Sequence, residues 1–173
     1  MPENKLAAHN EFQLVKNDPG YILYQPYNSE ENKSLIANFV RQKALAFCPY
    51  YFVEKSGKGS VTFFYPNEQL CGYKNILHGG FIASMLDEAL AFGIFGNFPS
   101  RLGVTFNLDV TYVAPSICGH LYKIVCNTTK IEGRKGWISG ELYRLADNEE
   151  PALCAKASGL FVEPSKINLE KHL

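Results

Sequence analysis

The chain has 173 residues, of which 46% are hydrophobic, and this suits one soluble globular domain with a sizeable core. Lysine plus arginine and aspartate plus glutamate each number 17, so the formal net charge is zero and gives no reason to expect nucleic acid or an anionic membrane surface as a partner. No membrane span is expected either, because no apolar run approaches the ~18 residues that cross a bilayer.

The five cysteines are widely spaced and form no C-x-x-C pair. An odd count with this spacing favours a reducing, intracellular compartment over a disulfide framework. The first twelve residues resemble neither a signal peptide nor an intact transit peptide. We therefore expect the protein in the cytoplasm, or in an organelle matrix such as the mitochondrion if a presequence has been removed.

The N-terminal part of the chain predicts few elements. Residues 1–20 are polar and end in the turn signal Asp18-Pro19-Gly20. A short extended segment is expected at residues 21–27. A helix capped by Asn28 or Ser29 should follow and run to about residue 47.

The middle of the chain predicts a hairpin and a long helix. Residues 50–55 and 60–65 read as strands joined by a turn at Gly57-Lys58-Gly59. After a loop at residues 66–77, an apolar helix is expected at residues 79–95.

The rest of the chain predicts four consecutive strands, at residues 104–113, 121–131, 136–145 and 152–162. In the first of these, one predicted face holds Val104, Phe106, Leu108, Val110 and Tyr112, and the other holds Thr105, Asn107, Asp109 and Thr111. Consecutive strands with short connections indicate an antiparallel sheet, on which the separate helix must pack, so the fold class is α+β.

The helix at residues 79–95 is apolar on nearly every side, which predicts that a sheet wraps around it, with a partner chain as a further cover. Its only polar side chains are Ser84, Asp87 and Glu88. A buried carboxylate is costly unless it is paired or protonated. For Glu88 we favour a local hydrogen-bond donor or ion pair, and for Asp87 we favour a functional role.

The tripeptide His78-Gly79-Gly80 stands where this helix begins. The first amides of a helix have no partner within it and carry the positive end of its dipole, and glycines let a ligand come close to them. Such a place can hold an anion or the oxyanion that forms when a carbonyl is attacked. The alternative is that the glycines only ease the turn and that His78 packs in the core.

Asp87 lies seven residues after Gly80, on the same helix face but ~10.5 Å further along the axis. One carbonyl cannot meet both groups at that separation. If both act on one carbon, the carboxylate must come from a second protomer, so a site across a dimer interface is predicted.

The segment H-G-G-F-I-A-S-M-L-D at residues 78–87, followed by four strands, resembles the hotdog-fold acyl-CoA thioesterases, in the branch of the phenylacetate-pathway enzymes and the thioesterase superfamily members. The resemblance covers roughly residues 50–163. It implies a hotdog fold, an antiparallel sheet wrapped around a long central helix. We accordingly expect an N-terminal extension with a helix at residues 1–48, a hotdog domain at 49–163 and a flexible tail at 164–173.

The resemblance also implies roles for particular residues. The backbone N–H of Gly79, with His78 nearby, would polarise the thioester carbonyl. Asp87 of the other chain would be the general base or the nucleophile. Thr105 matches the position where the family places a Ser or Thr that orients the water or the carboxylate.

Substrate contacts are expected at Gly80, Asn75 and Glu88. Some family members carry an asparagine six residues before the histidine, but Gly72 stands there in this chain. Asn75 is the nearest substitute for this second contact to the carbonyl, at a different spacing. Other hotdog branches use a glutamate close to the position of Glu88.

Lys135 and Arg134 are candidates to meet the phosphates of CoA, with a solvated basic turn as the alternative. The four histidines are isolated, so no metal site is expected, and no cofactor is expected beyond the coenzyme A of the substrate. The expected partners are acyl-CoA and further copies of the chain, as a dimer or a dimer of dimers. A non-catalytic acyl-CoA-binding or regulatory hotdog module is the alternative function.

Overall fold

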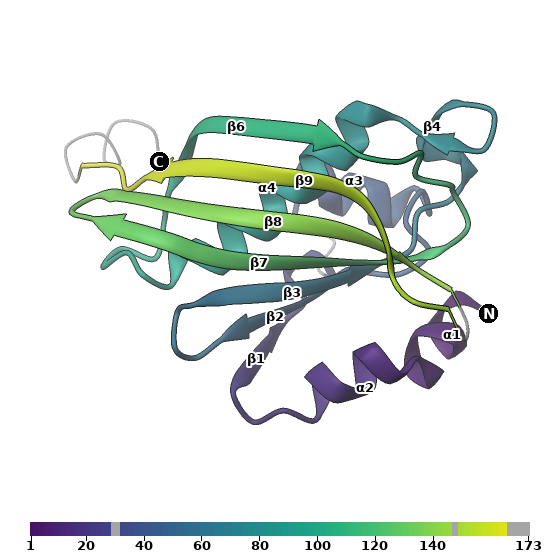
Figure 1. Ribbon diagram of the computed structural model, residues 1–173, viewed down its shortest axis with the longest axis horizontal. Coiled ribbons are helices and arrows are strands. Elements are labelled where there is room, and N and C mark those ends of the chain that lie inside the picture. The colour runs from purple at the N-terminus through teal and green to yellow at the C-terminus, as the bar shows by residue number, and fades with distance from the viewer. Residues whose placement is uncertain (29–31, 147–148, 166–173) are drawn as a thin grey trace.

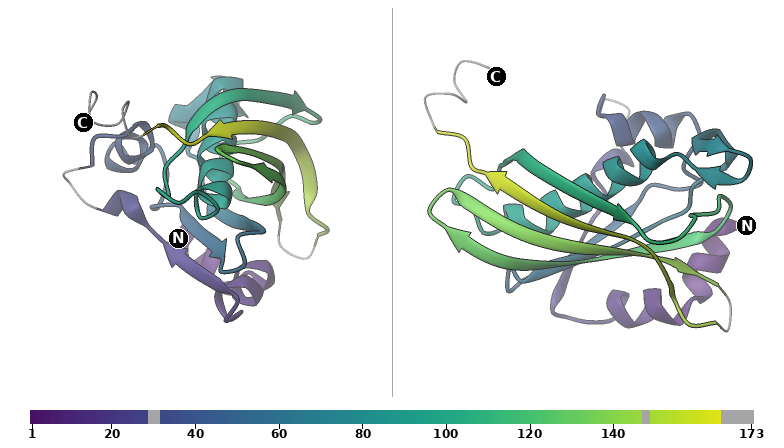
Figure 2. Two further views of the ribbon diagram at one scale, coloured as in Figure 1. Left: turned by 90° about the vertical axis from the view of Figure 1, so that its left-hand side faces the viewer. Right: turned by 45° about the horizontal axis from the view of Figure 1, so that its top comes forward.

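The computed structural model describes residues 1–28, 32–146 and 149–165, and in these its main feature is a seven-stranded antiparallel sheet (Figure 1). The strands in spatial order are β1 (Tyr21–Tyr24), β2 (Tyr50–Glu54), β3 (Gly59–Phe64), β7 (Leu121–Glu132), β8 (Lys135–Leu145), β9 (Ala152–Val162) and β6 (Val104–Tyr112). The sheet curves around one long helix, α4 (Gly79–Phe95), as both views in Figure 2 show. The predicted α+β class with an antiparallel sheet is confirmed.

The main core lies between α4 and the concave face of the sheet. Met85, Leu86, Leu90 and Ile94 on the helix are completely buried. A short helix, α3 (Leu35–Arg41), covers the beginning of α4. Within the described residues, no helix has the length and apolar character that crossing a membrane requires.

One stripe of α4 is left partly uncovered by the chain itself. The half-buried or exposed residues on it are Gly80, Ala83, Ser84, Asp87, Glu88, Ala91 and Phe92. Their spacing of three and four residues marks a single face of the helix. The predicted sheet does wrap around α4 but leaves this face open, and the further cover by a partner chain stays a prediction.

A second core lies on the convex face of the sheet, under the helices α1 (Pro2–Ala8) and α2 (Asn10–Lys16). Leu6 and Phe12 are 2% and 4% exposed. The Phe12 ring makes edge-to-face contacts with three rings of β2 and β3, at centroid distances of 5.2, 5.7 and 5.4 Å. The polar composition of residues 1–20 concealed these helices, because each buries only one large apolar side chain.

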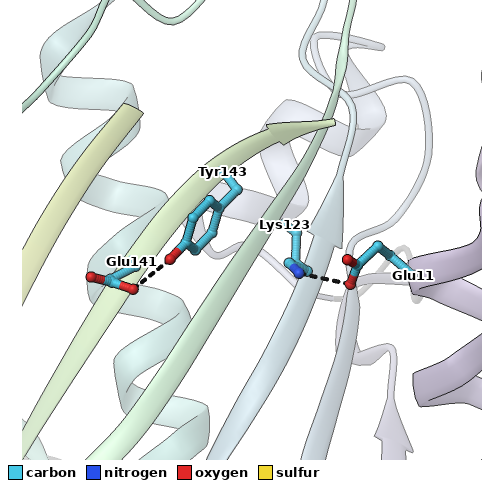
Figure 3. A network of polar contacts seen from close by, with 4 residues as sticks. All are labelled: Glu11, Lys123, Glu141 and Tyr143. Atoms are coloured by element: carbon cyan, nitrogen blue, oxygen red, sulfur yellow. Dashed lines mark hydrogen bonds and ion pairs between the residues drawn. The ribbon is translucent and has the colours of Figure 1, made fainter. Parts of the chain in front are cut away.

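Polar contacts also join α2 to this face of the sheet (Figure 3). The Lys123 ammonium on β7 lies 2.7 Å from a carboxylate oxygen of Glu11 on α2. The same ammonium lies 5.5 Å from the ring centroid of Tyr143 on β8, whose hydroxyl donates to Glu141 at 2.5 Å. These contacts are on the outer side of β7 and β8, away from α4.

The predicted helix at residues 28–47 is shorter than expected. Its N-cap is Ser34, whose Oγ accepts from the Ala37 amide at 3.3 Å, and not Asn28 or Ser29. Asn28 belongs to a 3-10 turn, η1 (Pro26–Asn28), and Ser29 is outside the described residues. The helix ends at Arg41, and Lys43 then takes a left-handed backbone with φ of 55°.

The loop predicted at residues 66–77 contains a 3-10 turn, η2 (Glu68–Leu70), and a small hairpin, β4 (Cys71–Tyr73) and β5 (Ile76–Leu77). Its backbone is fixed on two sides. The Leu77 amide donates to the Ser116 carbonyl and the His78 amide donates to the Leu70 carbonyl, both at 2.8 Å. These bonds set where α4 begins.

The extended segment predicted at residues 21–27 is a strand only at Tyr21–Tyr24, and the remaining predicted elements agree with the structure to within two residues. The first predicted hairpin is β2–β3, α4 has the predicted bounds, and the last three strands are β7, β8 and β9. Most of the predicted C-terminal tail, from residue 166, lies outside the described residues. The predicted N-terminal extension contributes β1 to the sheet through its pairing with β2.

Candidate active site

The N-terminus of α4 presents a free backbone donor at Gly79. His78 is the N-cap residue, and its Nδ1 accepts from the Gly80 amide at 2.9 Å. The His78 carbonyl accepts from the Ile82 amide at 3.1 Å. Within the described residues the Gly79 amide has no acceptor, so Gly79 and not Gly80 offers its N–H to a ligand. The substrate contact expected at Gly80 stays a prediction, and the Gly80 amide is already bonded to His78.

The cap also determines the state of the His78 ring. A nitrogen that accepts a hydrogen bond carries no proton, so the neutral ring holds its proton on Nε2. His78 is exposed, which rules out the alternative that it packs in the core. The Nε2–H group is therefore a second donor beside the Gly79 amide.

Gly72 lies directly against this histidine. A Cβ at position 72 would come within 2.9 Å of His78 Cδ2 and 3.2 Å of its Cα. An asparagine there would collide with the ring as it stands. Asn75 does not replace it closely: it forms the exposed turn of the β4–β5 hairpin with φ of 60°, and its carbonyl accepts from the Cys118 amide at 3.0 Å.

Asp87 is half-buried on the open stripe of α4 and is held by Thr105 of β6. The Thr105 hydroxyl donates to Asp87 Oδ1 at 2.9 Å. These are the two residues that the sequence predicted to act together.

The predicted face of Thr105 was nevertheless wrong. A bulge lies between Thr105 and Asn107, which pair with the adjacent residues Phe161 and Leu160 of β9. The extra residue, Phe106, is 74% exposed, and the shift turns Thr105 toward α4. Bulges are common beside active sites because they re-aim a side chain in this way.

Glu88 points away from this pair, toward the N-terminal extension. Its carboxylate accepts a hydrogen bond from the hydroxyl of Tyr27, which is buried in η1. Burial raises the pKa of Glu88 above its usual range. The contact agrees with the expectation of a local donor, and it is not a direct part of the Asp87–Thr105 arrangement.

A cavity of about 330 Å³ lies beside the beginning of α4. Its mostly apolar lining comes from α4, β5 and the end of β6, and includes Gly79, Ile82 and Tyr112. The Tyr112 hydroxyl donates to the Gly79 carbonyl at 2.7 Å. Sequence reasoning missed this contact, because regular alternation shows only the face of Tyr112 and not its partner.

The Gly79 amide and the Asp87 carboxylate of one chain are too far apart to act on the same carbonyl. Gly79 and Asp87 are eight residues apart on one helix, or ~12 Å along its axis.

The turn between β7 and β8, which includes Arg134, lies at the opposite end of the sheet from β4 (Figure 1). Arg134 there donates to the Glu163 carbonyl at 3.2 Å, and Lys135 is exposed.

Cys71 is the cysteine nearest to His78 in sequence. Burial raises the pKa of its thiol to about 11, which leaves little thiolate at neutral pH. All five cysteines lie among the described residues and are free thiols. Cys71 is therefore a poor candidate for a nucleophile.

Comparisons with known proteins indicate what the chain is similar to. A family model described as the thioesterase superfamily matches residues 74–150, which include His78, Asp87 and Thr105. A Schizosaccharomyces pombe protein described as uncharacterized is 68% identical over the whole chain, which covers 99% of it. The acyl-coenzyme A thioesterase THEM4 of Mus musculus is 28% identical, with 99% of this chain aligned to 69% of that protein.

Among solved structures, a putative thioesterase of Ralstonia eutropha, described as related to phenylacetic acid degradation, has a TM-score of 0.61 at 16% identity. The match covers 79% of this chain and 96% of that one. At this identity the likeness concerns the fold alone, which is the hotdog. Residues 74–150 are thus similar to the thioesterase superfamily in sequence, and the chain shares its hotdog fold.

Proposed function

We propose that the protein hydrolyses acyl-CoA thioesters to a carboxylic acid and CoA, at sites shared between two copies of the chain. The observation that carries the proposal is the Asp87 carboxylate, which stands on the open stripe of α4 and is oriented by Thr105 at 2.9 Å. The name of the mouse relative, an acyl-coenzyme A thioesterase, supports the substrate class.

In the proposed reaction, the thioester carbonyl lies at the N-terminus of α4. The Gly79 amide and His78 Nε2–H donate to its oxygen, and these bonds strengthen as negative charge develops there. Asp87 of the second copy takes a proton from the attacking water, or attacks the carbonyl carbon itself. The C–S bond then breaks, and the CoA thiolate leaves and is protonated. After direct attack the acyl group remains on Asp87 as a mixed anhydride, which water hydrolyses to release the carboxylic acid.

The second copy is proposed to pair along β6. This strand is at an edge of the sheet, and four apolar side chains on or next to it are about half exposed or more: Val104 56%, Phe106 74%, Tyr112 51% and Val113 51%. An open apolar edge of nine residues is a strong template for another strand, whereas β1, at the other edge, has only four. Two-fold pairing here would also cover the open stripe of α4.

The proposed two-fold pairing along β6 also provides a binding site for the CoA moiety. The apolar cavity beside Gly79 is suited to the pantetheine arm. A two-fold axis at β6 would bring the β7–β8 turn of one copy toward the β4 end of the other, because these lie at opposite ends of each chain (Figure 1). Arg134 and Lys135 would then be available to the CoA phosphates.

The test is thiol release from short, medium, long and aromatic acyl-CoAs by the wild type and by Asp87→Asn. We expect Asp87→Asn to lower kcat at least ~100-fold with little change in substrate binding. Glu141→Gln is the matched control, since that carboxylate lies on the outer face of the sheet. If no acyl-CoA is hydrolysed but acyl-CoA raises the melting temperature, the protein is an acyl-CoA-binding module and the proposal is overturned.

A further inference from the structure

We propose that Tyr112 is a positioning residue for the oxyanion donor: its hydroxyl holds the first turn of α4 so that the Gly79 amide is aimed at the thioester oxygen. The inference rests on the proposed hydrolysis and adds a residue to it. Tyr112 does not touch the reacting atoms in this scheme but acts through the backbone of Gly79.

The peptide group between Gly79 and Gly80 is held at both of its polar ends. Its carbonyl accepts from the Tyr112 hydroxyl at 2.7 Å, and its N–H donates to His78 Nδ1 at 2.9 Å. The approach of Tyr112 is close, since a Cβ on Gly79 would lie 3.2 Å from the hydroxyl oxygen.

The preceding peptide, between His78 and Gly79, is held only at its carbonyl, by the Ile82 amide at 3.1 Å. Within the described residues, its N–H is the group left without a partner. Gly79 thus offers one free donor from a backbone that is fixed on both sides of its Cα.

Two adjacent glycines make such fixing necessary. Glycine reaches a wide range of backbone angles, and the first amides of a helix lack the bonds that order later turns. An oxyanion donor accelerates a reaction only if it is already aimed where the charge will develop, within about 0.5 Å. A hydroxyl on the Gly79 carbonyl supplies an anchor that the two residues cannot supply themselves.

Strand β6 supplies the residues that orient both the Asp87 carboxylate and the Gly79 amide. Thr105 near the start of β6 holds Asp87, and Tyr112 at its end holds Gly79, so both side chains reach α4. Seven positions separate them, which would put them on opposite faces of a regular strand. The bulge at Phe106 brings them to the same face.

The first experiment compares the kinetics of Tyr112→Phe with those of the wild type. The ring and its packing remain and only the hydroxyl is lost, so we expect kcat to fall about 5- to 30-fold while KM changes less than about twofold. Tyr143→Phe is the control: it loses a comparable hydroxyl hydrogen bond on the outer face of β8 and should keep wild-type kinetics (Figure 3). Melting temperature and sedimentation establish that each variant is folded and associated as the wild type is.

A second experiment measures the polarisation of the substrate carbonyl directly. If Tyr112 had only a structural role, its hydroxyl would not affect this polarisation. A carbonyl-labelled acyl-CoA is bound to Asp87→Asn and to Asp87→Asn/Tyr112→Phe, and the carbonyl stretching frequency is measured by difference infrared spectroscopy. We expect a higher frequency in the double variant, because the carbonyl is less polarised. An unchanged frequency, or an unchanged kcat in Tyr112→Phe, would overturn the inference while leaving the hydrolysis standing.

Mixed dimers test the assignment by a third route. If each site combines Gly79 of one copy with Asp87 of the other, co-expressed Asp87→Asn and Tyr112→Phe chains should form about a quarter of all sites intact. Those sites should show wild-type kcat, whereas homodimers of either variant contain no intact site. No gain over the Tyr112→Phe chains alone would contradict a shared site, and a wild-type protein without hydrolysis would overturn both proposals.

Discussion

Replacing Thr105 by valine should slow hydrolysis without unfolding the protein. Valine has the same shape and suits a strand, but it removes the hydroxyl that donates to Asp87 at 2.9 Å. A hydrogen bond to a charged acceptor contributes up to about 3 kcal/mol, and because Thr105 is exposed we expect about 1–2 kcal/mol here. This corresponds to a kcat about 5- to 30-fold below wild type, measured by thiol release at saturating acyl-CoA.

Two further variants make this test specific. Thr105→Ser keeps the hydroxyl and should keep kcat within about threefold of wild type. Deleting Phe106 should make the strand regular with Thr105 only six positions from Tyr112, so Thr105 should still face α4 and kcat should fall less than in Thr105→Val. The reasoning is refuted if Thr105→Val matches wild-type turnover, or if Thr105→Ser is as slow as Thr105→Val.

Three other results are expected. Phe106→Asp puts a charge on the exposed β6 edge and should shift the protein toward monomer in sedimentation, with loss of hydrolysis. Because burial raises the pKa of Glu88, its stabilising contribution is complete below the unfolded-state pKa and is lost as pH rises through the folded-state pKa. Glu88→Gln should therefore melt at a higher temperature than wild type near about pH 8 but not near about pH 4; the reverse order would contradict the burial argument. Burial also raises the pKa of Cys48 to about 11 and of Cys126 to about 12, so titration of the native protein with a thiol reagent should show far slower reaction than after unfolding.

The features that are local in sequence were predicted well. The bounds of α4 follow from a continuous apolar segment that starts after His78 and ends before Pro99. Asp87 was singled out because a carboxylate in an apolar helix needs a reason, and its catalytic role stays a prediction. The last three strands were found because alternation and turn residues mark them directly.

The features that depend on distant contacts were not predictable in this way. The face of Thr105 is set by the register of β6 against β9, and a bulge leaves no mark in the alternation of a single strand. Ser34, Asn28 and Ser29 are equally good N-cap residues, so packing decides where α3 begins. The Tyr112–Gly79 hydrogen bond joins residues 33 positions apart, and nothing in either residue type indicates that the other is its partner.

The convex core has a consequence for the order of events in folding. Leu6 and Phe12 pack in a cluster with Leu121 and Leu145, which leave the ribosome much later. Helices of seven residues, such as α1 and α2, are not stable alone. They have no complete surface to dock on until β7 and β8 exist. The residues of α1 and α2 are therefore synthesised before β7 and β8 but are among the last to become ordered.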